Sequence, residues 1–443
     1  MARKHQTDIL FNTKIFNYKN SVNKYTNNKS FAILFLKVRK KSNINYLASS
    51  IEKLWEMYEN LKKGIVKDLP HQRVPHGYLS IILGYSQNVF KLKNIVKEIP
   101  RDFKNSQFLS PKKDGSGGYI LEKSQLSYSK DIHENVGLNE DITVQFVANT
   151  QLAVNRAIVE TWKHVREGLS SSTNYPLIFS KFFSGFQRDD GRSWLGFHDE
   201  VSNMRPGNER RDVISIHREN NELVARDFWT EFGTYMAFLR IEVDIDLWDS
   251  INRSKQELII GRDKLYGRPL VGVDKNNNPI TYNKIPIAQK IISYNKKYHD
   301  HPDYFKQVSN LPKKLKDKID INKSFKVLNE SHIGKTRHFD KIKHKFVPSR
   351  RIFRQGFEFI EPTYNLSNIP IKVGLNFLSF QNDPARLLFI LTDPNWLGNS
   401  SFGGDSQFRD INKLLHVQAC GIFFIPKMEK PFPGSCIFRE NCN

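Results

Sequence analysis

The stretch DITVQFVANTQLAVNRAIVETWKHVREG, residues 141–168, predicts a strand that leads directly into an amphipathic helix. Its first nine residues are rich in the β-branched and aromatic types that strands favour. From residue 150 the apolar side chains recur at the spacing of one helix face, and we expect the helix to end at Gly168. Three earlier segments complete the pattern: a strand at 31–38, an amphipathic helix at 42–64 with Gly64 as its stop, and a strand at 78–86. The order strand, helix, strand, strand, helix is that of a ferredoxin-like α+β unit.

The same order of elements recurs later in the chain, without a repeat of residue identities. Residues 234–245 alternate like a strand and lead into a short helix at 246–261 that stops at a glycine. The stretch 262–330 is rich in Lys, Asn and Pro, so we expect a long loop there. Further apolar segments follow at 373–381, 385–391 and 416–426. We therefore predict an α+β protein of two ferredoxin-like halves, 1–205 and 206–443.

The charge of the chain is strongly positive but diffuse. Its 443 residues hold 68 Lys and Arg against 46 Asp and Glu, a formal net charge of +22. Such a field favours association with anions and argues little about fold. No helix–turn–helix, zinc-finger or aromatic–basic signature accompanies the charge, so we expect no specific nucleic-acid partner.

The cysteine pattern and the lengths of the apolar runs bear on the cellular location of the protein. Cys420, Cys436 and Cys442 form no CxxC pair, which argues against a disulfide framework or a structural zinc site. Cys436 and Cys442 could oxidise together, although ordinary thiols are the simpler expectation. The first residues show no secretory signal, and the longest apolar run, 31–38, is too short to span a bilayer. We expect a soluble, cytoplasmic protein.

An acidic, glycine-hinged stretch, SGFQRDDGRSWLGFHDEVSN at 184–203, stands out against this basic background. Most of its charges are explained as turn and surface residues. Asp199 differs because it follows the apolar segment 195–197. From local sequence, a proton-transfer role for Asp199 and a turn or helix cap are equally good interpretations.

A second stretch, 329–359, holds three histidines and an arginine cluster. His338 and His344 lie among charged residues and suggest a solvated loop, and their spacing argues against zinc. His332 lies at the border of an apolar segment, where a buried histidine is the simpler interpretation. RRIFRQGFEF alternates like a strand that carries Arg354 inward, and a buried guanidinium needs an anion beside it.

These segments resemble those of dye-decolourising (DyP-type) haem peroxidases. GRSWLGFHDEVSN, 191–203, resembles the family's Gly-x-x-Asp-Gly loop, SHIGKTR the segment of the haem-ligating histidine, and RRIFRQGFEF that of the distal arginine. Four more segments match in order, so the resemblance runs through nearly the whole chain: QTDIL at 6–10, FGTYMAFLRIEVDIDLWD at 232–249, IIGRDKLYGRPL at 259–270 and GLNFLSFQ at 374–381.

The resemblance implies two ferredoxin-like halves of the dimeric α/β-barrel type, with a haem b pocket in the second half. It implies a peroxidase that reduces hydrogen peroxide and oxidises phenolic or dye-like donors. Asp199 and Arg354 would act on the distal side and His332 would ligate the iron. The remaining residues implied to contact the cofactor are Phe197, His198, Arg337, Leu375 and Phe377. Two alternatives stay open: a non-catalytic haem-binding or haem-iron handling protein on the same fold, and a basic nucleic-acid-associated protein without cofactor.

Two departures from the family pattern matter. Glu200 stands where the family loop ends in glycine, which suggests either an altered loop or a second carboxylate near the distal side that would raise the pKa of Asp199. The segment ARLLFILTDPNW has leucine where the family often supplies a carboxylate to the proximal histidine, which leaves Asp383 or Asp393 as substitutes. The sequence leaves open the physiological donor, the surface Tyr or Trp that could relay electrons, and the oligomeric state, with which a homo-oligomer is compatible.

Overall fold

The structure is a computed structural model, and it describes residues 29–69, 71–104, 111–113, 119–121, 140–198, 203–204, 207–217, 225–265, 267–280, 313, 317–335, 339–340, 345–346, 351–363, 371–387 and 414–440. Several predicted features lie outside these residues: the segment 6–10, the domain boundary at 205/206, Asp199, Glu200, Arg337, His338, His344, Asp393 and Cys442. The boundary therefore stays a prediction.

The first half has the predicted ferredoxin-like order. It runs β1 (Ser30–Val38), α2 (Ile44–Lys62), β2 (Ser80–Tyr85), β5 (Ile142–Ala148), α4 (Gln151–Ser171) and β6 (Leu177–Phe186). The strands form an antiparallel sheet in the order β2-β5-β1-β6. Apolar residues of α2 and α4 cover the outer face of this sheet in one continuous core. Short elements fill the connection before β5: η1 (Val89–Lys91), α3 (Arg101–Lys104), β3 (Pro111–Lys113) and β4 (Tyr119–Leu121).

The second half repeats that strand order. Its strands are β7 (Thr234–Val243), β12 (Phe353–Pro362), β13 (Ile371–Gln381) and β14 (Leu415–Ile425). They pair antiparallel in the order β14-β7-β13-β12, which matches β6-β1-β5-β2 of the first half, strand for strand. The smaller elements of this half are α5 (Asn208–Ile214), η3 (Ala225–Thr230), β8 (Gly272–Val273), β9 (Pro279–Ile280), β10 (Phe339–Asp340), β11 (Lys345–Phe346) and η5 (Ser435–Ile437).

The two sheets close into one eight-stranded barrel. One residue pair joins the two sheets at each place where they meet: Phe424 of β14 with Tyr85 of β2, and Glu358 of β12 with Phe186 of β6. Aromatic side chains fill the barrel, and the rings of Phe31 and Phe357 stack across the halves with centroids 4.2 Å apart. Packing inside the barrel therefore joins the halves more extensively than their strand ladders do.

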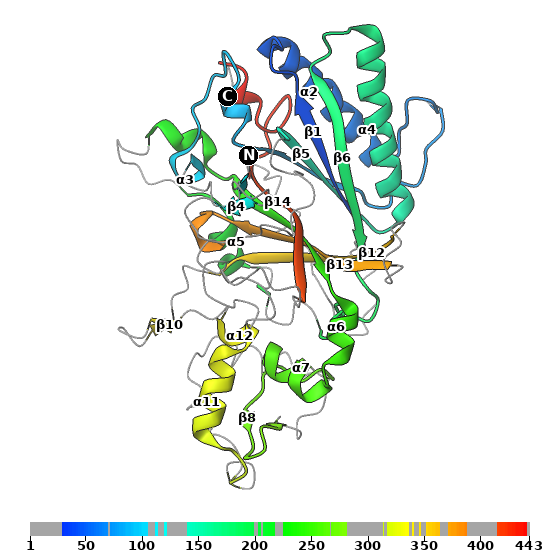
Figure 1. Ribbon diagram of the computed structural model, residues 1–443. Helices are drawn as coiled ribbons and strands as arrows, with labels where there is room; N and C mark the ends of the chain where they lie inside the picture. Colours follow the sequence, from blue (N-terminus) through cyan, green and yellow to red (C-terminus); the bar gives the residue numbers. More distant parts are fainter. Residues whose placement is uncertain are drawn as a thin grey trace.

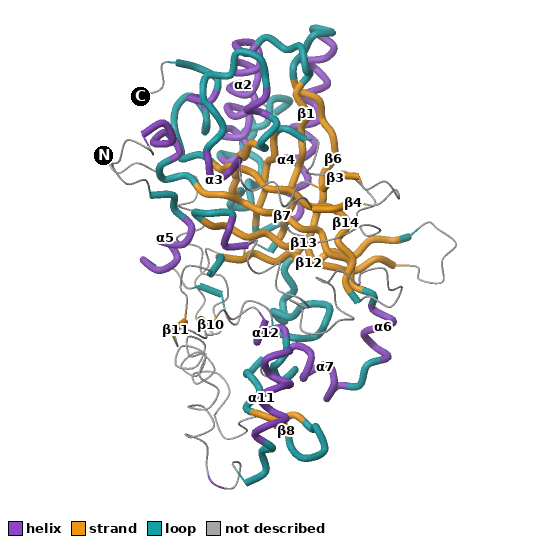
Figure 2. The backbone as a smooth tube through the Cα atoms, turned by 60° about the vertical axis from the view of Figure 1, so that its left-hand side comes forward, coloured by secondary structure: helices purple, strands orange, loops and turns teal. Residues whose placement is uncertain are grey.

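Four helices lie beyond the second sheet. They are α6 (Ile245–Ser250), α7 (Arg253–Ile260), α11 (Ile321–Glu330) and α12 (His332–Lys335). Both views place them on the side of the β7–β12–β13–β14 sheet that faces away from α2 and α4 (Figures 1 and 2). The second sheet therefore has its inner face in the barrel and its outer face turned toward α12.

Three sequence expectations were wrong in detail. The helix expected at 150–168 continues to Ser171, so Gly168 does not end it; at Gly168 the ring of Tyr175 packs closely, and a Cβ there would stand 2.5 Å from that ring. The helix at 246–261 is two helices, because the side chain of Asn252 accepts the N–H of Lys255 and starts α7 anew. The expected loop at 262–330 contains α11, which Asp320 caps through the N–H of Lys323.

Two other elements differ from expectation. Strand β6, the fourth strand of the first half, was not anticipated, and the acidic stretch from 184 begins inside it. Of the apolar segment 385–391, the described residues 385–387 form a helical turn. Cys420 and Cys436 are buried, and neither forms a disulfide with a described residue. No described helix is long and apolar enough to cross a membrane.

Candidate functional site

Three predicted site residues share the outer face of the second sheet. Arg354 of β12 stands opposite Ser379 of β13, and Gly356 stands opposite Phe377. Cross-strand partners point to the same face and alternate residues along a strand share it. Arg354, Phe377 and Leu375 therefore lie together on one face, while Phe353, Phe357, Leu378 and Phe380 point into the barrel.

This face carries polar atoms that lack partners. The hydroxyl of Ser379 and the side-chain amide of Gln381 are buried, and in the described part of the chain they form no hydrogen bond. Buried polar groups are normally paired. With half-buried Leu375 and Phe377 beside the Arg354 cation, the face fits a large, mostly apolar group that carries a few polar or anionic substituents. Haem has that character.

His332 is the first residue of α12. This helix lies on the side of the molecule toward which the outer face of the second sheet is turned (Figures 1 and 2). The hydroxyl of Ser331, which is 1% exposed, accepts the N–H of Gly334 at 3.2 Å and so starts the helical turn. Gly261, at the end of α7, touches this turn: a Cβ there would stand 2.5 Å from the Ser331 Oγ and 2.6 Å from Ile333. His332 itself is half-buried.

The acidic stretch folds into a small hairpin that ends directly before Asp199. Arg192 and His198 form a β-bridge, and the N–H of Gly196 closes the turn on the oxygen of Ser193 at 2.8 Å. The Arg192 guanidinium donates to the main-chain oxygens of Gly196, Lys264 and Leu265, at 2.6, 2.6 and 2.9 Å. The hairpin is therefore held against the loop that follows Gly261.

In this contact Phe197 is buried and His198 is half-buried. Phe197 is 5% exposed and its ring lies 6.3 Å from that of Trp248 between centroids, with the Lys264 ammonium 5.8 Å from the Phe197 ring centroid. Burial lowers the pKa of His198, the Arg192 charge lowers it further, and a hydrogen bond to the Leu265 main chain opposes both. His198 is thus favoured as a neutral imidazole.

Asn203 was missed by sequence reasoning, yet it links the acidic stretch to β12. Its Oδ1 accepts the main-chain N–H of Arg354 at 3.1 Å, and its Nδ2 donates to the Arg354 oxygen at 2.6 Å. Asn203 is four positions after Asp199 in the sequence. Its only signal in the sequence was membership of the acidic stretch.

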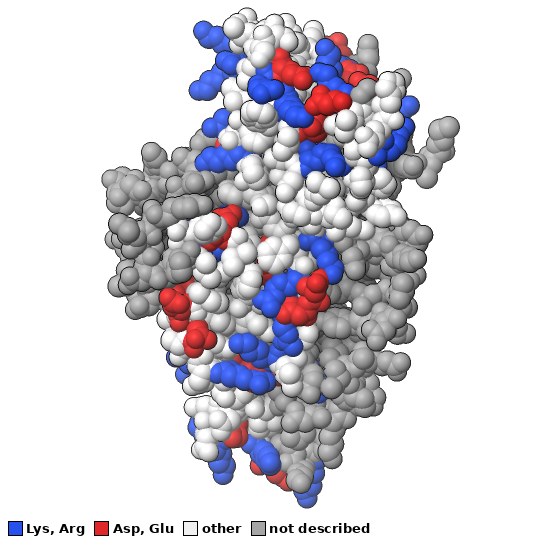
Figure 3. Space-filling model, turned by 90° about the vertical axis from the view of Figure 1, so that its right-hand side faces the viewer, with Lys and Arg blue, Asp and Glu red and all other residues white. Residues whose placement is uncertain are grey.

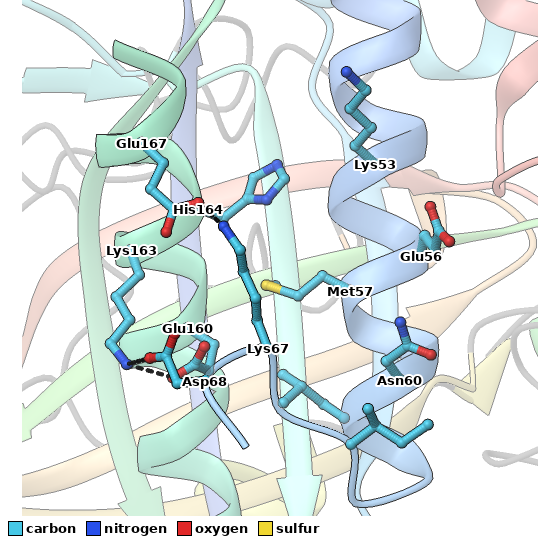
Figure 4. Close-up of a pocket in the computed structure, with 12 residues that line it drawn as sticks. Lys53, Glu56, Met57, Asn60, Lys67, Asp68, Glu160, Lys163, His164 and Glu167 are labelled. Carbon is cyan, nitrogen blue, oxygen red and sulfur yellow. Dashed lines mark hydrogen bonds and ion pairs between the residues drawn. The ribbon is translucent and has the colours of Figure 1, made fainter. Parts of the chain in front are cut away.

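A separate cavity of about 400 Å³ lies between α2 and α4, and none of the predicted site residues lines it (Figure 4). Ion pairs flank it: Lys163 binds Asp68 at 2.8 Å and Glu160 at 3.0 Å, and Lys67 binds Glu167 at 2.6 Å. These five charged side chains pair with one another, and Lys53 and Glu56 also line the cavity. Elsewhere, basic and acidic side chains are interspersed on the face that Figure 3 presents, in line with a diffuse positive charge.

The comparisons with known proteins agree with this architecture. A family model described as Dyp-type peroxidase, C-terminal, matches residues 190–430, more than half of the chain. This chain therefore belongs to the Dyp-type peroxidase family. Among the described residues, no cluster of three or more His, Cys, Asp or Glu could hold a metal ion by itself.

Curated relatives match a shorter part. A deferrochelatase of Shigella flexneri is 30% identical over 136 residues, 29% of this chain and 31% of the relative. A deferrochelatase of Escherichia coli K12 is 29% identical over 136 residues, 29% of this chain and 30% of the relative. The matched region thus spans about a third of the length of these relatives.

Solved structures match the whole fold. The DyP-type peroxidase from Cellulomonas bogoriensis is 16% identical with a TM-score of 0.60, and 95% of each chain is covered. DtpA from Streptomyces lividans, as an oxyferrous complex, is 16% identical with a TM-score of 0.61 and 93% coverage of each chain. At this identity the likeness establishes the fold: two ferredoxin-like halves, as expected.

Proposed function

We propose that the chain is a haem-dependent peroxidase that reduces hydrogen peroxide and oxidises phenolic or dye-like donors. The observation that carries the proposal is the outer face of the second sheet. Arg354, Leu375 and Phe377 share it, unpaired polar atoms of Ser379 and Gln381 lie on it, and α12 with His332 lies on its side of the molecule. Family membership supports the same function.

In this proposal the His332 imidazole would ligate the iron of haem b, and the bound haem would supply the redox chemistry of peroxide reduction. Asp199 takes a proton from peroxide and returns it to the departing oxygen. The Arg354 guanidinium stabilises the negative charge that develops as the O–O bond breaks. Leu375 and Phe377 exclude water, and Phe197, His198 and Arg337 are the further residues proposed to line the cofactor.

The decisive measurement is an absorption spectrum of the purified protein, before and after one equivalent of peroxide. We expect a haem band that changes with peroxide, together with turnover of an anionic dye. Asp199→Asn and Arg354→Leu should each lower turnover by about 100-fold or more while haem stays bound. His332→Ala should lose or loosen haem. Full turnover in both distal variants, or unchanged haem binding in His332→Ala, contradicts these roles.

A second candidate is a haem-iron handling protein on the same fold. The name deferrochelatase, which the curated relatives carry, favours it, and so does Glu200 in place of the family glycine. Incubation with haem in the absence of peroxide separates the two: free iron and intact porphyrin support iron handling, and peroxide-dependent dye turnover supports the peroxidase.

We also propose a cytoplasmic location and a homo-oligomer. A structural neighbour from Mycobacterium smegmatis, with a TM-score of 0.54 and 14% identity, is described as an encapsulated DyP-type peroxidase. Light scattering of the purified chain gives its mass in solution, and a monomeric mass contradicts the oligomer.

A further inference from the structure

The side chain of Asn203 replaces a missing strand partner of β12. Strand β12 pairs with β6 only at Glu358, so among the described residues no strand faces the outer edge of Arg354. Main-chain N–H and C=O groups are costly to leave unpaired. The Asn203 amide satisfies both groups of Arg354, at 3.1 and 2.6 Å, as a neighbouring strand would.

The orientation of the Asn203 amide is determined by its surroundings. Oδ1 receives two donors, the N–H groups of Arg354 and of Met204, the latter at 3.0 Å. Nδ2 faces an acceptor, the Arg354 oxygen. Asparagine is the short side chain that offers an acceptor on one side and a donor on the other. Aspartate has the same shape but would set an acceptor against the carbonyl oxygen.

A buried arginine contacts the residues next to Asn203 and Arg354. Arg210 of α5 is 2% exposed, and its Nε donates to the oxygen of Met204 at 3.0 Å. Its guanidinium carbon lies 4.2 Å from the ring centroid of Phe353, the residue before Arg354. The Arg210 side chain therefore contacts both Met204, which follows Asn203, and Phe353, which precedes Arg354.

We propose that Asn203 is a positioning residue for Arg354. By closing the edge of β12 at Arg354, it sets the main-chain position from which the guanidinium projects onto the outer face of the second sheet. Because Asn203 bonds both main-chain groups of Arg354, it acts on this side chain through the main chain from which the guanidinium projects. The functional part of this inference rests on the proposed peroxidase function, whereas the structural part does not.

The structural part is tested by hydrogen exchange on the full chain, with and without haem. In Asn203→Ala the amide of Arg354 should exchange about tenfold faster, the effect of losing roughly one net hydrogen bond. Asn203→Asp keeps the side-chain volume and an acceptor for the Arg354 N–H, but it faces the Arg354 carbonyl with an oxygen, so exchange should rise by a smaller factor than in Asn203→Ala. Asn155→Asp, on the exposed face of α4 where its described partner is Gln151, controls for the added charge. Unchanged exchange at Arg354 in both Asn203 variants overturns the inference.

The functional part is tested by the steady-state kinetics of peroxide turnover. Asn203→Ala should lower kcat/KM for peroxide by about 10- to 100-fold, because a small misplacement of a catalytic group has that effect. The KM for a dye donor and the haem content should stay at wild-type values, as should all parameters of Asn155→Asp. Faster exchange at Arg354 with unchanged kinetics overturns the positioning role. A wild-type chain without peroxide turnover instead refutes the proposed function. The exchange result alone then tests whether Asn203 pairs with the main chain of Arg354.

Discussion

The side chain of Lys264 occupies the space beside Gly196: a Cβ at position 196 would stand 2.4 Å from the Lys264 Cε. Gly196 also has a φ of +82°, which L side chains rarely adopt. The Lys264 ammonium is in turn held by the Gln256 Oε1 at 2.6 Å. The hairpin that precedes Asp199 therefore depends on a glycine at its turn.

Gly196→Ala should destabilise the chain by about 1 to 3 kcal/mol, because it adds backbone strain and displaces Lys264. Denaturant unfolding measures the loss. Gly207→Ala shows the cost of backbone strain without a steric contact, since Gly207 has a φ of +146° and nothing within 4 Å of its Cβ position. A loss from Gly196→Ala that stays the same in a Lys264→Ala background would show that Lys264 contributes nothing.

Arg240 should be the most costly single truncation in the barrel. It is 2% exposed, and it binds Glu361 at 2.7 Å, Asn376 at 3.0 Å and Gln418 at 3.3 Å. Arg240→Met leaves these acceptors without their donor and should cost about 3 to 5 kcal/mol in unfolding free energy. Glu361→Gln, at a side chain that is 43% exposed, should cost less than about 1 kcal/mol. The prediction fails if the two variants are equally stable.

Asp141 should make stability fall as pH rises. Burial raises its pKa to about 6, although the N–H of Val38 donates to it at 2.6 Å and opposes the shift. A carboxyl with a raised folded-state pKa contributes fully below its ordinary value, and the contribution is lost as pH rises through the folded value. Between about pH 4 and 7, wild type should lose up to about 3 kcal/mol relative to Asp141→Asn.

Unfolding curves of both proteins across this range measure the difference. Asp249→Asn, at an exposed aspartate of α6, controls for removal of a carboxylate. A difference between wild type and Asp141→Asn that does not change with pH would rule out the buried carboxyl as its source.

His164 should make stability fall as pH drops. Burial lowers its pKa from 6.5; the charges of Lys67 and Lys53 lower it further, and that of Glu167 opposes them. A depressed histidine contributes stability above its ordinary value that is lost as pH falls below it. His164→Phe keeps the edge-on contact with Tyr175, whose ring centroid lies 6.5 Å away, and should lose less stability than wild type between pH 7 and 5. Melting temperatures at both pH values test this, with His71→Phe at an exposed loop as control.

Much of the fold could be predicted because its elements carry local patterns. The two runs of strand and helix follow from side-chain periodicity, which depends only on near neighbours. Where prediction failed, a specific contact that side-chain periodicity does not encode decided the outcome. Gly168 suggested a helix end, but the ring of Tyr175 packs against it and the helix continues.

The candidate site was predictable in part. Arg354, Leu375 and Phe377 were chosen from resemblance, and pairing of β12 with β13 places them on one face. The joint between Asn203 and Arg354 could not be anticipated, because the two residues are 151 positions apart. A lone asparagine in an acidic stretch carries no local sign of such a contact.

By itself the sequence indicated most of the strands and helices, and the family, because periodicity and motif spacing are properties of neighbouring residues. Tertiary structure decided the closed barrel, the shared face of Arg354 and Phe377, and the role of Asn203 at the edge of β12. Those features depend on which main-chain groups remain unpaired once the sheets have closed, and only the packing of distant segments determines that.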